Sequence, residues 1–268
     1  MFDLTVSPFT LQRRFDYNFI LKNPDVLSTT IHPTFTLCAA GFYNGAVVIA
    51  DLSSTPPIIK HYFTHHTDWV SCVTFHPNLP FFATGSCDNT AILYNLTTLP
   101  PTIQYHFKNR QMGHITSIHF HSTRSFLLLG SFNAGLLILY NLSTSPPTTC
   151  LHISKTWTYS FSFHPSLPLL SVGFSTGFIN LYDLSTVPPT AKHQLRYNKQ
   201  YITSTVFHAS IPVLAACLYN NIVIFYNLAT SPPTIKHHII KTTSTISSIA
   251  FHSSLPLFAT GLTTNSKT

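Results

Sequence analysis

The stretch HTDWVSCVTFHPNLPFFATGSCDNTAILYNL, residues 66–96, decides the fold of this 268-residue chain. Its apolar residues come in short alternating or continuous runs, and a fourth run follows it, so that the runs cover 70–75, 81–84, 90–94 and 102–107. Turn-forming residues separate them at 76–80, 85–89 and 97–101. Short apolar runs bounded by Pro, Gly, Asn and Asp are typical of β-strands. The stretch therefore predicts four strands in succession.

The same pattern recurs along the whole chain. A histidine, usually in Phe-His or Phe-His-Pro, marks each copy at intervals of 43 to 45 residues: His32, His76, His121, His164, His208 and His252. Nine residues later stands a small residue: Gly41, Gly85, Gly130, Gly173, Cys217 and Gly261. A Pro-Pro pair follows in five copies, at 56–57, 100–101, 146–147, 188–189 and 232–233. The repeat units are approximately 28–64, 70–108, 115–154, 158–196, 202–241, and 246–268 plus 1–15.

Four short strands repeated at this interval are typical of a β-propeller blade. Each blade buries the faces of its sheet only against its neighbours, so one repeat cannot fold alone. The proline pairs fit turns or strand edges, because proline donates no ladder hydrogen bond. We therefore predict one all-β domain over 1–268, a β-propeller of six four-stranded blades.

The second repeat resembles the WD-repeat (WD40) family. The resemblance is carried by His66-Thr-Asp-Trp-Val70, Val73-Thr-Phe-His-Pro77, Ala83-Thr-Gly-Ser86, Asp88 and Ile92-Leu-Tyr-Asn-Leu96. The chain departs from the family where the third strand commonly ends in Trp-Asp, since here it ends in Ala50-Asp51, Tyr94-Asn95, Tyr140-Asn141, Tyr182-Asp183 and Tyr226-Asn227. The resemblance thus identifies a divergent member of the family.

The family's blades are stabilised by a network of a turn histidine, a strand hydroxyl, an aspartate and the tryptophan. Carried over by position, the resemblance implies a structural network of His66, Asp88 and Tyr94, with His114 in the next repeat. Ser71 or Thr84 would supply the hydroxyl. The third repeat has Asn133 in place of the acid, so we expect stability to depend more on apolar packing than on this network.

The two ends of the chain match complementary parts of a repeat. Residues 1–8 align with 93–100, and residues 261–268 align with 85–92. We expect both termini to share the last blade and close the ring. The alternative is a piece of a longer array with an open sheet edge, which invites pairing with another protein.

Composition excludes several classes of function. The chain has 14 Lys and Arg against seven Asp and no Glu, and its charged residues make up only 8%. A hydrolase needs a nucleophile with a base and an orienting acid, or paired carboxylates, and seven Asp without Glu offer little material for either. No Gly-rich phosphate loop is present in the sequence. Adjacent histidines such as His65-His66 lack further ligands nearby. We therefore predict no enzyme, no metal site and no cofactor.

Five scattered cysteines without a CxxC pair indicate a reducing compartment. No secretory leader opens the sequence, and no stretch is apolar enough for a membrane span. The expected location is the cytoplasm, with the nucleus as an alternative.

In the WD-repeat family, partners most often dock on the loops before the first strand and after the second strand of each blade. By position, these loops contain Trp69, Arg110, Met112, Lys155, Trp157, Tyr159, Tyr197, Lys199 and Tyr201 in one set, and Tyr43, Phe132, Phe174 and Tyr219 in the other. Trp, Tyr, Phe, Met and Arg are the residues enriched at protein interfaces.

The function predicted from this face is that of a protein-interaction scaffold or adaptor that binds a protein or peptide, with a subunit of a larger complex as a variant of the same function. The alternative is binding to nucleic acid or an anionic surface through scattered basic residues, namely Lys155, Lys199, Arg110, Arg13, Arg14, Lys60, Lys192, Arg196 and Lys236. Binding driven by phosphates would weaken steeply with salt, whereas an aromatic protein interface should not.

Overall fold

The computed structural model describes residues 2–3, 10–11, 25–108, 112–131, 135–154, 158–240, 245–252 and 254–263. Within these ranges every helix or strand is a β-strand. They form five four-stranded sheets and two two-stranded sheets, and all neighbouring strands are antiparallel. The predicted all-β propeller of four-stranded blades is confirmed in these five sheets.

The strands follow the repeat along the chain. The first blade contains β3 (Val26–Ile31), β4 (Leu37–Phe42), β5 (Val47–Asp51) and β6 (Ile58–Phe63). The second contains β7 (Val70–Phe75), β8 (Phe81–Ser86), β9 (Thr90–Asn95) and β10 (Thr102–Lys108). The third contains β11 (Ser117–Phe120), β12 (Phe126–Ser131), β13 (Leu136–Asn141) and β14 (Thr148–Ile153).

The fourth blade contains β15 (Thr158–Phe163), β16 (Leu169–Phe174), β17 (Phe178–Asp183) and β18 (Thr190–Arg196). The fifth contains β19 (Ile202–Phe207), β20 (Val213–Leu218), β21 (Ile222–Asn227) and β22 (Thr234–Ile240). The two-stranded sheets are β23 (Thr245–Phe251) with β24 (Phe258–Thr263), and β1 (Phe2–Asp3) with β2 (Thr10–Leu11).

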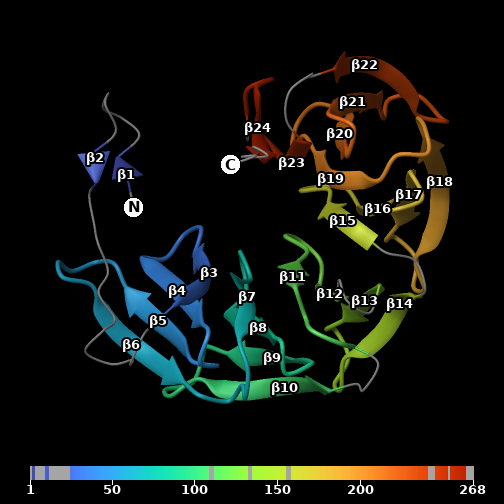
Figure 1. The fold of residues 1–268 in the computed structure, drawn as a ribbon. Helices are drawn as coiled ribbons and strands as arrows, with labels where there is room; N and C mark the ends of the chain where they lie inside the picture. Colours follow the sequence, from blue (N-terminus) through green and yellow to red (C-terminus); the bar gives the residue numbers. More distant parts are fainter. Residues whose placement is uncertain are drawn as a thin grey trace.

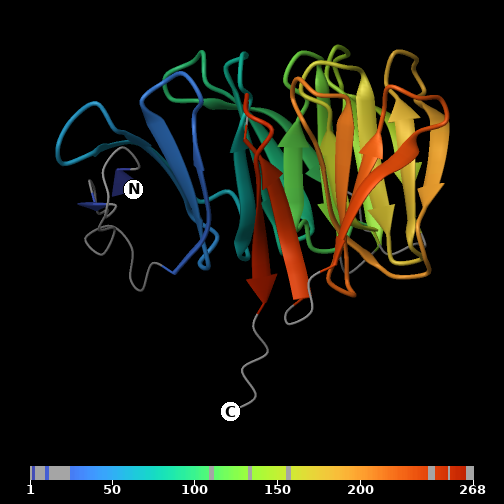
Figure 2. The ribbon, with the colours of Figure 1, turned by 90° about the horizontal axis from the view of Figure 1, so that it is seen from above.

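The blades are arranged around a central axis, with the first strand of each blade innermost and the fourth strand outermost (Figure 1). First strands of successive blades contact one another, for example β3 with β7 and β19 with β23. Figure 2 shows that the strands run side by side and that their connections gather at two opposite ends of the ring. We call these the turn end, where first strands turn into second strands, and the loop end, where second strands finish and the next first strands begin.

Close packing between blades explains the small residue of the repeat. A Cβ added at Gly85 would lie 2.5 Å from Cγ2 of Ile115 in the third blade. A Cβ at Gly173 would lie 2.5 Å from Cγ2 of Ile202 in the fifth blade. At these two positions a branched apolar side chain of the following blade takes the space that a larger residue would need.

The repeated histidines bind blade to blade at the turn end. Each accepts backbone N–H groups from its own turn at Nδ1, at 2.9 to 3.3 Å. Five of them also contact the phenylalanine that ends the first strand of the next blade, with ring centroids 5.0 to 5.3 Å apart: His32 with Phe75, His76 with Phe120, His121 with Phe163, His164 with Phe207, and His208 with Phe251. The repeat histidines are thus hydrogen-bonded within their own turns.

Four of these histidines, His32, His76, His121 and His164, are held towards the neutral form in the folded protein. An imidazole nitrogen that accepts N–H bonds carries no proton, and burial disfavours the charged ring. Burial lowers the pKa of His76 to about 4, with smaller contributions from His121 and His32. Burial also lowers the pKa values of His32, His121 and His164.

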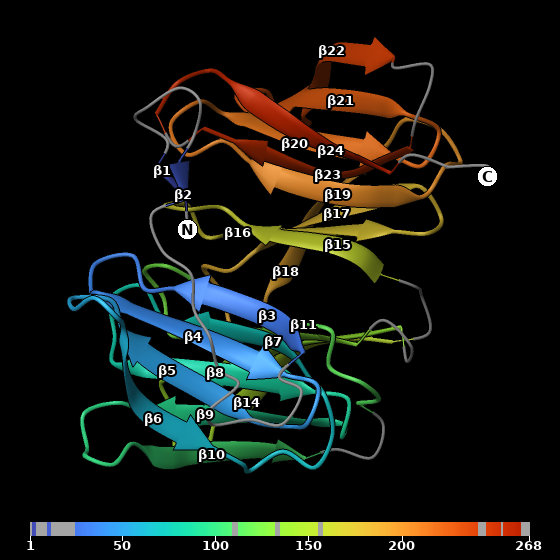
Figure 3. The same cartoon turned by 60° about the vertical axis from the view of Figure 1, so that its left-hand side comes forward.

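The sixth repeat contains the seam of the ring. There β23 and β24 pair with each other, and the described residues show no third strand beside β24. The hairpin of β1 and β2 lies on the side of the ring where the sixth and first blades face each other (Figures 1 and 3). Its register, Phe2 opposite Leu11, matches that of Tyr94 opposite Ile103 between the third and fourth strands of the second blade. Closure of the ring by both termini stays a prediction.

Candidate functional site

Aromatic side chains are exposed at the loop end of the ring. Four of the residues assigned there from the sequence are 41 to 57% exposed: Tyr43, Trp69, Tyr201 and Tyr219. Tyr43 and Tyr219 directly follow second strands, and Trp69 and Tyr201 directly precede first strands. The repeat therefore places equivalent positions together, and each of the four has an aromatic neighbour.

The first aromatic pair joins the first and second blades. The rings of Tyr43 and Trp69 have centroids 4.1 Å apart and planes inclined by 31°. Backbone hydrogen bonds hold both residues, since Tyr43 N–H donates to the Asp25 carbonyl at 3.0 Å and Cys87 N–H donates to the Trp69 carbonyl at 2.8 Å. Two half-exposed rings are thus presented on an ordered backbone.

The second aromatic pair lies within the fifth blade. The rings of Tyr201 and Tyr219 have centroids 6.0 Å apart and planes inclined by 51°. Tyr219 N–H donates to the Tyr201 carbonyl at 3.0 Å, which is the same backbone bond that joins Cys87 to Trp69. The exposed side chain of Lys199 stands two residues before Tyr201.

The structure corrects two of the sequence-based assignments to this face. Met112 and Phe174 are buried in the clusters of the second and third blades and of the third and fourth blades, respectively. Tyr197 is half-buried, and its ring lies 6.0 Å from that of His238. Met112 precedes a first strand and Phe174 ends a second strand, and both pack against residues of the preceding blade, so their type alone did not reveal burial.

Several other assignments fall on residues that the structure does not describe. Arg110, Phe132, Lys155 and Trp157 lie outside the described ranges, and so does the side chain of Tyr159. Their place on the loop end stays a prediction.

A hydrogen-bond network beneath the first aromatic pair fixes the loop before β7. The buried ring of His66 bonds Asp88 Oδ2 through Nδ1 at 2.8 Å and Thr84 Oγ1 through Nε2 at 2.8 Å. Thr67 N–H also donates to Asp88, at 3.1 Å. The Tyr94 hydroxyl lies 3.1 Å from Nδ1 of His65. Thr84 therefore supplies the strand hydroxyl, and the network serves the loop that carries Trp69.

The corresponding turn of the third blade is different. His114 is exposed there, and the position of Asn133 lies outside the described ranges. The network of a buried histidine, a strand hydroxyl and an aspartate is thus seen in the second blade.

Basic residues on the outer strands are partly engaged within the protein. Lys60 lies 3.3 Å from Asp51, Lys192 lies 3.8 Å from Asp183, and the guanidinium of Arg196 stands 4.6 Å from the ring centre of Phe178. Lys60 lies on β6 of the first blade, whereas Lys192 and Arg196 both lie on β18 of the fourth blade. Each of these three cations thus has a partner within the protein.

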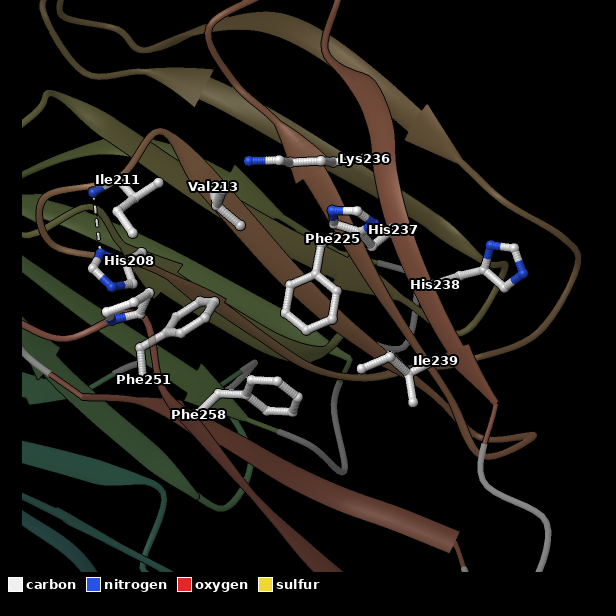
Figure 4. A pocket seen from close by; sticks show the side chains of 11 residues that line it. His208, Ile211, Val213, Phe225, Lys236, His237, His238, Ile239, Phe251 and Phe258 are labelled. Carbon is white, nitrogen blue, oxygen red and sulfur yellow. Dashed lines mark hydrogen bonds between the residues drawn. The ribbon is translucent and has the colours of Figure 1, made fainter.

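A cavity of about 550 Å³ lies between the fifth blade and the sheet of β23 and β24. Figure 4 shows Phe225, Phe251 and Phe258 gathered on one side of it and Lys236 and His237 on the other. Its lining is mainly apolar and contains no carboxylate. It lies at the seam, beside the edge of β24, and its apolar lining is that of a hydrophobic core which no further described strand covers.

The residues that sequence reasoning missed are the aspartates beside the first pair. Asp68 Oδ1 accepts the N–H of Trp69 at 2.8 Å, and Asp25 bonds Tyr43 through its carbonyl. Their adjacency to aromatic residues in the loops was visible in the sequence, but the pairing of Tyr43 with Trp69 across two blades was not. Among the described residues, no three His, Cys or Asp side chains could hold a metal ion. The same part of the chain contains no helix able to cross a membrane.

Comparison with known proteins agrees with this fold. The WD40 family model, described as WD domain, G-beta repeat, matches residues 58–95. No curated protein matches the sequence. The predicted resemblance to WD repeats is thus confirmed in the second repeat and, for the rest of the chain, at the level of the fold.

Solved structures of WD-repeat propellers superpose well on this one. Sqt1 from Chaetomium thermophilum has a TM-score of 0.73 at 16% identity, with 86% of this chain and 63% of that chain covered. Sqt1 bound to the N-terminus of the ribosomal protein L10 gives 0.73 at 15% identity, covering 86% and 66%. A chain of the Mitotic Checkpoint Complex gives 0.73 at 14% identity, covering 90% and 72%. This chain therefore spans about two thirds of the length of Sqt1.

Proposed function

We propose that this WD-repeat propeller is a non-enzymatic scaffold or adaptor that binds a protein or peptide at its loop end. The observation that carries the proposal is the pair of exposed aromatic contacts, Tyr43 with Trp69 and Tyr201 with Tyr219. Tyr and Trp dominate the binding energy of protein interfaces because they bury a large area with few rotatable bonds. Both pairs stand on loops fixed by backbone hydrogen bonds, which lowers the entropy lost on binding.

The comparisons support a protein partner. One structural relative is bound to the N-terminus of a ribosomal protein, and another belongs to a multiprotein complex. At 14 to 16% identity these relatives share the fold, and the partner of this chain does not follow from theirs. We propose membership of a larger assembly as one form of the same function.

Cysteine chemistry supports a reducing compartment. All five cysteines are free thiols, and burial raises the pKa of Cys72 and of Cys217 to about 12. Buried thiols of this kind are inert core residues. We propose the cytoplasm as the working compartment, with the nucleus as an alternative.

The test is a crosslinked pull-down from the native source, with and without nuclease. Wild type is compared with Trp69→Ala plus Tyr201→Ala, and Tyr62→Ala serves as a control because Tyr62 is similarly exposed but lies on an outer strand. We expect a specific protein that is recovered with wild type and the control, lost with the double variant, and unaffected by nuclease. Recovery of nuclease-sensitive partners that survive the double variant would reject the proposal and favour binding through the basic outer strands.

A further inference from the structure

We infer that the Tyr43–Trp69 pair, together with Asp25 and Asp68, forms a site for a cationic side chain, so that the partner presents a lysine or arginine there. The inference rests on the proposed function and names the chemistry of its partner. It concerns one of the two aromatic pairs, and the other provides an internal comparison.

The two rings form an open aromatic surface rather than a filled contact. Tyr43 and Trp69 are 46% and 41% exposed although their centroids lie only 4.1 Å apart. Each residue therefore has exposed surface that a third group can contact. The faces of Trp and Tyr rings carry negative electrostatic potential and attract Lys and Arg cations.

Tight backbone packing fixes the distance between the two loops. Gly45 has a φ of +82°, and a Cβ there would lie 2.6 Å from the His66 carbonyl and 3.2 Å from the Asp68 carbonyl. The loop that carries Tyr43 thus lies directly against the loop that carries Trp69. The aromatic surface is preorganised by this contact and by the His66–Asp88–Thr84 network beneath it.

The described loop segments beside this surface carry negative charge. The loop segments at 43–46, 64–69 and 87–89, with residue 25, contain Asp25, Asp68 and Asp88 and no Lys or Arg. Burial raises the pKa of the Cys87 thiol, and the negative charges of Asp68 and Asp88 raise it further. A cation placed over the rings would therefore meet carboxylates in addition to π surface, and charge-assisted contacts are stronger than neutral ones.

The second aromatic pair lacks this charge pattern. Tyr201 and Tyr219 have Lys199 nearby, and the segments 197–201 and 219–221 contain no Asp. The two pairs thus have the same type of surface with opposite neighbouring charges. A cation is expected to choose the Tyr43–Trp69 pair, although the whole chain carries a formal net charge of +7.

The test is selection of random 12-residue peptides displayed on phage against the immobilised full chain, followed by affinity measurement on the synthetic peptides that emerge. We expect selected peptides to share an essential Lys or Arg, and replacing it by norleucine or citrulline should weaken binding at least tenfold. Asp25→Asn plus Asp68→Asn should weaken the same peptides by a similar factor. The amide oxygen that Asp68→Asn introduces can still accept the Trp69 N–H, so this variant removes charge and keeps the loop.

The outcomes separate this inference from the proposed function. Peptides that bind at the loop end but need no basic residue, or that lose affinity with Tyr219→Ala and not with Trp69→Ala, would overturn the cation site and leave the scaffold function standing. If no peptide is enriched, or enriched peptides bind unchanged to Trp69→Ala plus Tyr201→Ala, both are overturned.

Discussion

The turn end and the loop end of the ring are built from residues of opposite character. At the turn end the same histidine recurs in all six repeats, and in five it is buried against a phenylalanine of the next blade. At the loop end, the residue equivalent to Tyr43 varies, being Cys87, Ser175 and Tyr219 in the second, fourth and fifth blades, and both tyrosines are exposed. Residues that every repeat shares hold blades together, whereas residues that vary between repeats are available to a partner.

The largest expected difference between the two ends is in the unfolding free energy lost when an aromatic side chain is truncated. Phe207→Ala removes a buried ring that contacts His164 at 5.1 Å, and truncation of a buried phenylalanine costs about 3–5 kcal/mol. Tyr219→Ala, at the loop end, should change the unfolding free energy by less than about 0.5 kcal/mol. Urea unfolding of both variants measures this, and equal losses would abolish the distinction between the ends.

The sixth blade provides a further test of the comparison, because within the described residues no third strand covers its core. Phe258 is 40% exposed, whereas Phe82, at the equivalent position of the second blade, is 0% exposed beneath Tyr94. If the ring closes as predicted, Phe2 takes the place of Tyr94 beside the cavity of Figure 4. Phe258→Ala should then cost about 3 kcal/mol, the lower end of the range for a buried phenylalanine.

The prediction would be contradicted if Phe258→Ala lowered the unfolding free energy by no more than about 0.5 kcal/mol, as expected for an exposed residue. That outcome would indicate an open edge at β24, which is the alternative of a longer array. Deletion of residues 1–15 supplies the matched control, because in the truncated chain Phe258→Ala should have little further effect.

Acid should weaken the turn end selectively. The pKa of His76 is about 4 in the folded protein against 6.5 for an ordinary histidine, so the unfolded chain binds a proton first as pH falls. Stability from this neutral ring is complete above pH 6.5 and is lost as pH falls towards 4, by on the order of 1–3 kcal/mol. Unfolding by urea at about pH 7.5, 6 and 4.5 measures the slope.

His76→Asn is the matched variant for this effect. An asparagine side chain can accept the same backbone N–H groups two and three residues ahead and does not titrate. We expect a shallower dependence of the unfolding free energy on pH than in wild type. An unchanged slope would show that protonation of His76 does not contribute to the acid sensitivity.

The repeat explains why the fold could be predicted from the sequence and part of the site could not. His76, Gly85 and the proline pairs fix strand order and turns through local chemistry that each copy repeats. Exposure at the loop end depends on contacts between blades: Met112 is covered by neighbouring strands, while Tyr43 meets Trp69 across a blade boundary. Such contacts join residues far apart in sequence, so residue type alone did not separate Trp69 from Met112.

The hydrogen-bond network at His66 could also be predicted only in part from the sequence. The family pattern implied His66 and Asp88, but it left Ser71 and Thr84 open as the hydroxyl. The fold decides between them, because Thr84 faces the His66 ring whereas Ser71 bonds the Ile115 carbonyl of the next blade. Strand alternation and register, rather than composition, set this choice.

The most direct test of the division between the two ends measures stability and partner capture on the same variants. Trp69→Ala plus Tyr201→Ala represents the loop end, and His76→Ala represents the turn end. The account predicts that the loop variant keeps the wild-type urea midpoint and loses its partner, while the turn variant unfolds at lower urea yet captures the partner under conditions where it is folded. Loss of capture by folded His76→Ala, or wild-type capture by the loop variant, would contradict it.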